Sequence, residues 1–357
     1  MTAPTTPSDH HRVAFVTGGS GFVGGRLITH LLARGWQVRA LARSAESEAQ
    51  VKTLGATPVR GELNDDQALR KAMTECEVVF HVAAHFKLWG NREIFDRINV
   101  EGTRAVVNAA AATASVRRLI AVSAAAVVMG DPEPMLNADE NLPLQVRAFS
   151  PYGSSKAEGE RVLLAANGMR PGLETIALRP PFIWGGKMPT LDHMVETVNA
   201  GRWQWVAGGT QAMSSCHVDN LCDALILAAD RGRGGEAYFI ADAEQSTLRS
   251  FISSLLATRG VTAADKSVPF GMAWTMAGLM GAAWRALRLK GEPPITRQML
   301  RLIGKPFTIS TRKAQAELGY APRITMDEGL AAMRQSESRL VSSSAHRGER
   351  RASVVSV

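Results

Sequence analysis

The sequence predicts an α/β protein with a doubly wound parallel sheet and a smaller C-terminal lobe. Its first element is a continuous apolar, β-branched run, Val13 to Thr17, as in a strand buried on both faces. Predicted strands and helices then alternate up to about residue 180, which is typical of a parallel sheet covered by helices. After that point the pattern loosens into helices with a few short strands. We therefore expect a Rossmann-like domain over residues 13–180 and a substrate lobe over 181–335, interleaved with it.

The turn after the first strand is rich in glycine, and an amphipathic helix over residues 22–33 follows it. Three glycines spaced three apart would permit a tight turn, a close approach of the backbone to a pyrophosphate, and close helix packing. The first turn of the helix adds free N–H groups and the positive end of the helix dipole. The spacing is one residue longer than G-x-G-x-x-G, and the alternative is a purely structural turn. We expect a dinucleotide pyrophosphate to bind at Gly18, Gly21, Phe22, Val23 and Gly24.

The second predicted strand, residues 37–42, ends at Ala42, and Arg43 and Ser44 follow. An acidic residue at the end of this strand would bind the ribose 2′-hydroxyl of NAD. A cation without a carboxylate suits a 2′-phosphate instead. We therefore expect NADP, with Arg43 and Ser44 among its contacts. The alternative is that Arg43 is merely solvated and that NAD is also accepted.

The remaining elements follow in order, and a doubly wound sheet binds its ligands beyond the C-terminal ends of its strands. We expect a third strand from residue 59, a helix from 66, a fourth strand over 77–84, a long helix over 92–114, and strands over 118–123 and 174–179. A further helix begins at Ser150 and Pro151, which suit the N-cap and the first helical position. In the lobe we expect a short strand over 237–240 and helices over 191–199, 218–230, 248–257, 296–303, 311–318 and 326–333, the last opened by a capping box at Thr325 and Glu328.

Tyr152 and Lys156 lie four residues apart on the helix that begins at Ser150, so they share one face. A nearby ammonium favours the phenolate and lowers the pKa of a tyrosine from about 10. Tyr152 could then exchange a proton with a substrate oxygen while a nicotinamide exchanges hydride, and Lys156 could bind the nicotinamide ribose. Such a pair is common by chance on helices, so its significance comes from the dinucleotide turn upstream. Ser123, the only hydroxyl within residues 121–130, is the expected third catalytic group.

Composition limits the compartment and the partners. The 357 residues carry a formal net charge of +8, part of it in a basic, Ser-rich tail over 336–357 that we expect to be disordered. Residues 1–12 are expected to form a disordered leader, because they lack the apolar core of a signal peptide. The three cysteines have no paired spacing, which fits a reducing cytoplasm. His81 and His85 fall on a strand and a loop, so we expect no metal, and the sequence contains no nucleic-acid module.

One segment of the lobe, residues 270–284, is apolar apart from one threonine, and two arginines follow it. At about fifteen residues it is short for a bilayer span, which needs roughly 20. We expect a buried lobe helix. The alternatives are a peripheral membrane contact through residues 270–289, with Trp274 and Trp284 at headgroup depth, or an entrance for a lipid-like substrate.

Together these motifs resemble the extended short-chain dehydrogenase/reductase family of the NAD-dependent epimerase/dehydratase superfamily. The matching stretches are the glycine turn, His81-Val-Ala-Ala, Asn99-Val-Glu-Gly-Thr, the Tyr152/Lys156 pair, Leu178-Arg-Pro-Pro-Phe-Ile-Trp-Gly185 and His217-Val-Asp-Asn220. Phe86-Lys-Leu-Trp-Gly and the apolar segment are similar to the 3β-hydroxysteroid dehydrogenase branch, which includes 2-alkyl-3-oxoalkanoate reductases. The resemblance implies an NAD(P)-dependent oxidoreductase that interconverts a secondary alcohol and a ketone on a large apolar substrate. It also implies cofactor contacts from Glu62, Leu63, Ala83, Asn99, Val122, Pro180 and Ile183.

Two positions depart from the family pattern. Ala125 stands where family members usually carry the catalytic serine, two residues beyond Ser123, and loss of one such donor could cost about a hundredfold in rate. Glu62 stands where the family more often has Asp near the adenine.

Three aromatic residues, Phe86, Trp89 and Trp184, are candidate substrate contacts, with ordinary core packing as the alternative. The alternative enzyme class is a nucleotide-sugar epimerase or dehydratase, which would need polar and basic contacts for a diphosphate. The alternative outside enzymes is a dinucleotide sensor without turnover, suggested by Ala125. A homodimer is also open.

Overall fold

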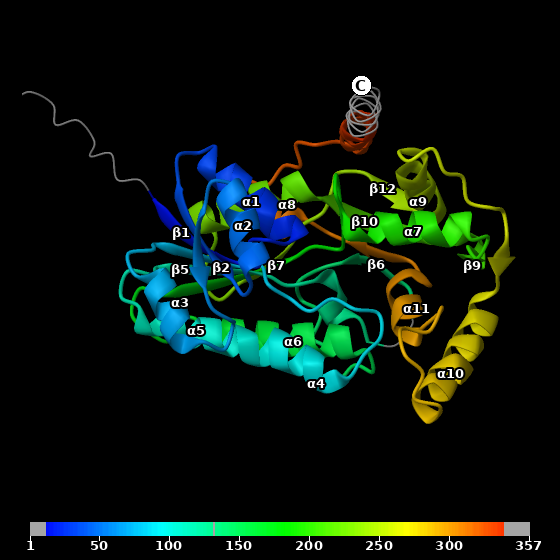
Figure 1. The fold of residues 1–357 in the computed structure, drawn as a ribbon, viewed down its shortest axis with the longest axis horizontal. Coiled ribbons are helices and arrows are strands. Elements are labelled where there is room, and N and C mark those ends of the chain that lie inside the picture. Colours follow the sequence, from blue (N-terminus) through cyan, green and yellow to red (C-terminus); the bar gives the residue numbers. More distant parts are fainter. Residues whose placement is uncertain (1–11, 131–132, 339–357) are drawn as a thin grey trace, which may run out of the picture.

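The structure, a computed structural model, describes residues 12–130 and 133–338. Its centre is a seven-stranded sheet in the order β11-β7-β5-β4-β1-β2-β3, in which all neighbouring strands are parallel (Figure 1). The strands are β1 (Val13–Thr17), β2 (Gln37–Ala42), β3 (Thr57–Arg60), β4 (Val78–His81), β5 (Arg118–Val122), β7 (Glu174–Arg179) and β11 (Ala237–Phe239). The doubly wound, Rossmann-like sheet predicted from the sequence is confirmed.

Helices cover both faces of this sheet because neighbouring strand residues point to opposite sides. Val16 packs with Leu27 in the apolar cluster on one face, whereas Phe15 packs with Val107 in the cluster on the other. The first face carries α1 (Phe22–Leu32), α2 (Ala45–Thr53), α8 (Val218–Arg231) and α12 (Arg312–Leu318). The second carries α3 (Asp66–Met73), α5 (Gly102–Ala112) and α6 (Pro151–Ala165).

The chain order reverses at β1, which lies between β2 and β4. Thr17 is the register partner of His81, so the C-terminal ends of β1 and β4 lie side by side. A crevice at such a reversal is where open α/β sheets bind ligands. The fold therefore brings the glycine turn and the loop after β4 to one edge of the sheet.

A smaller sheet forms the lobe, in the order β12-β10-β14-β6, with β8 also paired to β10. Its strands are β6 (Met135–Ala138), β8 (Phe182–Trp184), β10 (Ala212–His217), β12 (Gln245–Thr247) and β14 (Phe307–Ile309), and β9 (Trp205–Val206) pairs separately with β13 (Ser267–Val268). Its helices are α7 (Pro189–Asn199), α9 (Leu248–Ala257), α10 (Phe270–Ala286), α11 (Arg297–Ile303) and a helix over residues 326–338. The predicted capping box is present, because Glu328 accepts from the Thr325 N–H at 2.9 Å and its own N–H donates to Thr325 Oγ1 at 3.3 Å.

The two parts exchange strands, so a cut at residue 180 does not separate them. β6 comes from the first part of the chain but belongs to the lobe sheet, while β11 comes from the second part and forms an edge of the main sheet. We assigned the strand over 237–240 to the lobe and predicted no strand at β6.

The long helix expected over residues 92–114 is interrupted. It consists of α4 (Arg92–Phe95), a π-helix (Asp96–Glu101) and α5. The Asn99 carbonyl in the π-helix accepts from Thr103 Oγ1 at 2.7 Å, and a Cβ added to Gly159 of α6 would lie 2.3 Å from the same oxygen. The π-helix therefore lets α6 approach closely at a glycine, and such segments often occur at functional sites.

The expectation of a buried helix at the apolar segment is wrong. α10 buries only Ala273, Ala277 and Gly281, and several of its large apolar side chains are exposed. Figure 1 shows α10 at the outer margin of the lobe, with α11 on its inner side. Within the described residues, none of the helices is long and apolar enough to span a bilayer.

The ends of the chain are only partly described. Arg12, assigned to the leader, binds Asp230 at 2.5 Å and lies over the Trp36 ring at 3.9 Å. The rest of the leader lies outside the described residues. Residues 336–338, assigned to the disordered tail, are helical, and residues 339–357 lie outside the described part.

Candidate active site

The glycine turn after β1 has the shape that a pyrophosphate requires. Gly18 has a φ of 73°, and a Cβ added there would lie 2.8 Å from the Ala83 backbone nitrogen. A Cβ on Gly24 would lie 2.1 Å from the Gly18 carbonyl oxygen. Gly21 precedes α1 without any side-chain cap, so the first N–H groups of the helix, from Phe22 and Val23, are available to an anion. The residues present therefore fit a dinucleotide.

A buried polar network joins the ends of β1 and β4. Thr103 Oγ1 donates its proton to the Asn99 carbonyl, so towards His81 it can only be an acceptor. His81 Nε2 therefore donates to Thr103 Oγ1 at 3.0 Å, and the unprotonated His81 Nδ1 accepts from the Thr17 hydroxyl at 2.8 Å. Thr17 Oγ1 in turn accepts from the Ala83 N–H at 3.2 Å. Burial lowers the pKa of His81 to about 3, assisted by the Lys156 charge, so His81 is neutral. The network fixes the Ala83 backbone beside the glycine turn. Both threonines lie in stretches identified from the sequence, but their hydrogen bonds were not predicted.

Asn99 connects the loop after β4 to the catalytic helix. Its Oδ1 accepts from the His85 N–H at 2.7 Å, and its Nδ2 donates to the His85 carbonyl at 3.1 Å and to Ser155 Oγ at 3.0 Å. The whole amide is therefore engaged within the protein. Asn99 holds the site together, and its predicted contact with the cofactor stays a prediction.

Helix α6 carries Tyr152 and Lys156 to the C-terminal end of β5. Ser150 caps the helix by accepting from the Gly153 N–H at 3.2 Å, and Pro151 occupies its first turn, as expected. Lys156 Nζ donates to the Val122 carbonyl at 2.7 Å, which brings two of the predicted site residues together. Burial lowers the pKa of Lys156 to about 8, partly opposed by the negative charge of Glu160.

The phenol of Tyr152 is packed against an aromatic ring. Phe86 meets it edge-on, with ring centroids 4.9 Å apart. Burial raises the pKa of Tyr152 well above its usual value, whereas the sequence argument expected Lys156 to lower it. Without a bound cofactor, Lys156 does not lower the pKa of Tyr152. Desolvation disfavours the phenolate, and the Lys156 ammonium is bound to the Val122 carbonyl.

Ser123 is held in a different set of contacts from the one expected. Its hydroxyl donates to Glu160 Oε2 at 2.5 Å, and Glu160 also binds the buried Arg179 guanidinium. Glu160 lies eight residues beyond Tyr152 on α6, which at 1.5 Å per residue is about 12 Å along the helix axis. This placement supports a structural role for Ser123. Its catalytic role stays a prediction.

The other predicted cofactor contacts lie around the same edge. Arg43 is exposed and forms no ion pair within the part of the chain that the structure describes. Ser44 caps α2 through reciprocal bonds with Ser47. The Pro180 carbonyl accepts from the Ala125 N–H at 2.8 Å. Glu62 is exposed, and Leu63 and Ile183 are half-buried.

The three aromatic candidates for substrate contact differ in position. Phe86 is 49% exposed beside Tyr152. Trp89 lies against α10, since a Cβ on Gly281 would be 3.3 Å from its ring. Trp184 is fully buried, its Nε1 donates to Asp242 Oδ2 at 2.7 Å, and it packs against His217, which favours the alternative of core packing.

Helix α11 holds the loop of Phe86 in place, which the sequence did not predict. Thr296 Oγ1 donates to the Leu88 carbonyl at 2.9 Å, and Gln298 Nε2 donates to the Lys87 carbonyl. Gln298 Oε1 also accepts from the Tyr152 N–H at 3.4 Å. The lobe therefore positions both the loop and the start of α6.

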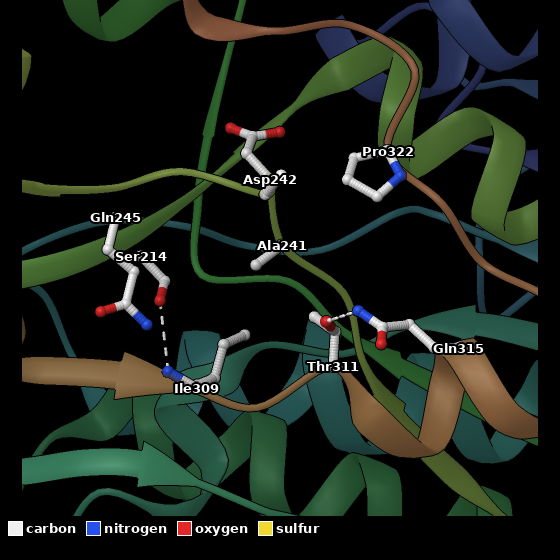
Figure 2. Close-up of a pocket in the computed structure, with 9 residues that line it drawn as sticks. Ser214, Ala241, Asp242, Gln245, Ile309, Thr311, Gln315 and Pro322 are labelled. Carbon is white, nitrogen blue, oxygen red and sulfur yellow. Dashed lines mark hydrogen bonds between the residues drawn. The ribbon is translucent and has the colours of Figure 1, made fainter.

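Two cavities lie apart from these residues. One, of about 200 Å³, lies between β10, β14 and α12 and is shown in Figure 2. Ser214 Oγ accepts there from the Ile309 N–H, and Gln315 Nε2 donates to Thr311 Oγ1. The other, of about 620 Å³, is lined by charged side chains near β6 and α12. Neither is lined by Tyr152, Lys156 or the glycine turn, so neither defines the candidate active site.

Comparison with known proteins agrees with this geometry. The chain is 42% identical to a 4-hydroxy-2-methyl-3-oxo-4-farnesyl-3,4-dihydroquinoline-1-oxide ketoreductase from Stigmatella aurantiaca, covering 90% of this chain and 95% of the relative. It is 34% identical to a 2-alkyl-3-oxoalkanoate reductase from Stenotrophomonas maltophilia, covering 90% and 98%. The crystal structure of gox2253 aligns with a TM-score of 0.73 at 29% identity, covering 91% and 99%.

The fold and the named relatives, which are reductases and dehydrogenases, define the chain as an NAD(P)-dependent oxidoreductase. More narrowly, the chain belongs to the 3-beta hydroxysteroid dehydrogenase/isomerase family, whose model matches residues 15–270. The UDP-glucose 4-epimerase of Thermotoga maritima has a TM-score of 0.71 at 19% identity over 92% of this chain and 99% of its own, which shows a shared fold. The resemblance stated from the sequence is confirmed.

Proposed function

We propose that the protein reduces a ketone on a large apolar substrate with NADPH. The observation that carries the proposal is the position of Tyr152 and Lys156, one turn apart on α6. Tyr152 packs against the exposed Phe86, and Lys156 binds the C-terminal end of β5, at the edge of the sheet that holds the glycine turn. The names of the two relatives, both reductases, support the same direction.

The protonation states suit this direction. A bound nicotinamide would supply the hydride. Tyr152 is protonated at neutral pH, as any tyrosine with an ordinary or raised pKa is, so it can donate a proton to the ketone oxygen. Lys156, with a pKa of about 8, is mostly an ammonium at pH 7 and can stabilise the phenolate left behind.

The surroundings of Tyr152 favour an apolar substrate over a sugar nucleotide. Phe86 packs edge-on against the phenol, and Phe149 lies against Trp274 of α10 with ring centroids 5.7 Å apart. A diphosphate would need cations beside the reacting centre, whereas the side chain that packs against the Tyr152 phenol is the ring of Phe86. This argues against the epimerase or dehydratase alternative.

The choice of NADP rests on Arg43. It follows β2 directly, it is exposed, and within the described residues it forms no ion pair with a carboxylate. A guanidinium at this position can bind a 2′-phosphate through charge-assisted hydrogen bonds. The cytoplasmic location and the homodimer stay predictions.

The decisive experiment is Tyr152→Phe, assayed with NADPH and a long-chain 2-alkyl-3-oxoalkanoate, a 3-oxosteroid and UDP-glucose as alternative substrates. We expect ketone reduction by the wild type and a loss of kcat of about a hundredfold or more in the variant, the usual contribution of a general acid. NADPH binding, measured by fluorescence titration, should stay unchanged because the glycine turn is intact. Undiminished turnover in Tyr152→Phe would refute the mechanism, and turnover of UDP-glucose alone would favour the epimerase.

A further inference from the structure

Helix α10 has an apolar outer face. Met272, Met276 and Leu279 are exposed at helical spacing along it, and Leu279 is 69% exposed. The one hydroxyl on this side, of Thr275, donates to the Gly271 carbonyl within the helix. Leu287 and Leu289 continue the exposed apolar surface beyond the helix end. A helix that faces water carries polar side chains outward, so this face indicates an interaction site.

The inner face of α10 is built for close contact with the rest of the lobe. The buried residues Ala273, Ala277 and Gly281 recur every four positions and form one stripe. Trp89 packs against Gly281. A Cβ added to Gly278 would lie 2.4 Å from Arg297 Nη2, so the Arg297 guanidinium packs against this glycine. These contacts fix which side of α10 faces outward.

Exposed basic side chains lie at the C-terminal end of the apolar face. Between residues 270 and 305 the chain has six cations and one acid, Glu292, which lies 3.5 Å from Lys87. Arg288 and Lys290 stand exposed in the turn after α10, and neither forms an ion pair within the described residues. Arg285 lies over the Trp89 ring at 4.8 Å. An apolar helix face edged by Lys and Arg is complementary to an anionic lipid surface, in which the helix lies parallel to the membrane.

We propose that α10 and the turn after it seat the protein on an anionic lipid surface, with Met272, Met276, Leu279, Leu287 and Leu289 in the acyl boundary and Arg288 and Lys290 among the headgroups. The helix lies on the membrane, because within the described part of the chain no helix can cross it. The contact goes beyond the proposed function and does not depend on it. If both hold, a ketone dissolved in the bilayer would reach Tyr152 past Trp89 and Phe86.

The test uses the full chain and flotation with vesicles of phosphatidylcholine, with and without phosphatidylglycerol. We expect the protein to float with the anionic vesicles, and less with the neutral ones. The double variant Met276→Gln/Leu279→Gln should lower the vesicle affinity about tenfold, because two apolar side chains leave the acyl boundary. Arg288→Gln/Lys290→Gln should lower it about fivefold per cation on anionic vesicles only.

Matched controls distinguish binding through this surface from non-specific binding to vesicles. Leu136 on β6 is 63% exposed, and Leu136→Gln should leave binding unchanged. Lys71 on α3 is exposed, and Lys71→Gln should do the same. Tyr152→Phe should float like the wild type, which keeps this result independent of the enzymatic one. The outer-face variants should also fold, as checked by their Tm.

Three outcomes would overturn the proposal. The first is the absence of flotation with anionic vesicles. The second is unchanged binding by the double variant. The third is a dimer, seen by sedimentation velocity, that the Met276→Gln/Leu279→Gln variant no longer forms. If the wild type then floats no better with anionic than with neutral vesicles, a second copy of the chain covers α10.

Discussion

Ser123 shows how one contact can change the interpretation of a residue. Its hydroxyl donates to Glu160, which already neutralises Arg179, and this buried group lies beyond Lys156 on the helix. We predict that Ser123→Ala lowers the free energy of unfolding by about 2 kcal/mol, the usual value of a hydrogen bond to a charged group. Its kcat should stay within about threefold of the wild type, because the phenol and the ammonium are untouched. A loss near a hundredfold, as for an oxyanion donor, would restore Ser123 to the catalytic set.

Arg43 carries the choice of cofactor, and it is separable from catalysis. We predict that Arg43→Ala lowers kcat/KM for NADPH by about ten- to a hundredfold, since a charge-assisted hydrogen bond contributes roughly 1.5–3 kcal/mol. The value for NADH should change little, because NAD has no 2′-phosphate. Lys52→Ala is the control, because Lys52 is exposed on α2, the helix that follows Arg43 and Ser44. Equal losses with both cofactors would contradict the NADP proposal.

At the level of single residues, the sequence predicted what depends on local spacing. The glycine turn, the Ser150 cap and the Tyr152/Lys156 face each lie within one turn or helix, so neighbouring residues determine them. The partner of Ser123, the burial of Trp184 and the raised pKa of Tyr152 depend on residues far away in the chain. Those features require the tertiary structure.

Helix α6 approaches the π-helix closely at a glycine. Gly159 lies against the Asn99 carbonyl, where an added Cβ would lie 2.3 Å from oxygen. We predict that Gly159→Ala lowers the free energy of unfolding by about 2 kcal/mol, since backbone must shift to admit the methyl group. It should also lower kcat, because α6 carries Tyr152.

A second helical glycine provides the control for this prediction. Gly271 of α10 has nothing within 4 Å of an added Cβ, so Gly271→Ala should leave the Tm unchanged or slightly raised. Equal destabilisation by the two substitutions would show that the contact with Asn99 does not account for the effect, because helix propensity by itself favours alanine at both positions.

Elements with strong local signals were predicted well. β7 and α9 have the predicted bounds, and α11 and α12 begin within one residue of expectation. The π-helix was missed because it arises from packing of Asn99 against α6, not from hydrophobic periodicity. The exposure of α10 was missed because an apolar sequence is compatible with a protein core and with a membrane surface alike.

Across the whole molecule, the exchange of strands connects the main sheet to the lobe. β11 leads from the edge of the main sheet to Asp242, whose carboxylate accepts from Trp184 Nε1, Ser215 Oγ, the His217 N–H and Asn220 Nδ2 at 2.7–2.8 Å. These donors come from β8, β10 and α8, so one carboxylate joins both parts of the fold. The sequence could not show this, because the partners lie more than twenty residues from Asp242.

We therefore predict that Asp242→Asn destabilises the whole protein. An amide turns one acceptor into a donor, so it faces donors that it cannot satisfy, at a cost of about 3 kcal/mol in the free energy of unfolding. The urea midpoint should fall for both the main sheet and the lobe, as followed by hydrogen exchange in β1 and β10. Asp265→Asn is the control, because Asp265 is an exposed lobe carboxylate with Arg249 as its partner. Loss of protection in β10 alone, with β1 unchanged, would show that Asp242 stabilises the lobe without joining it to the sheet.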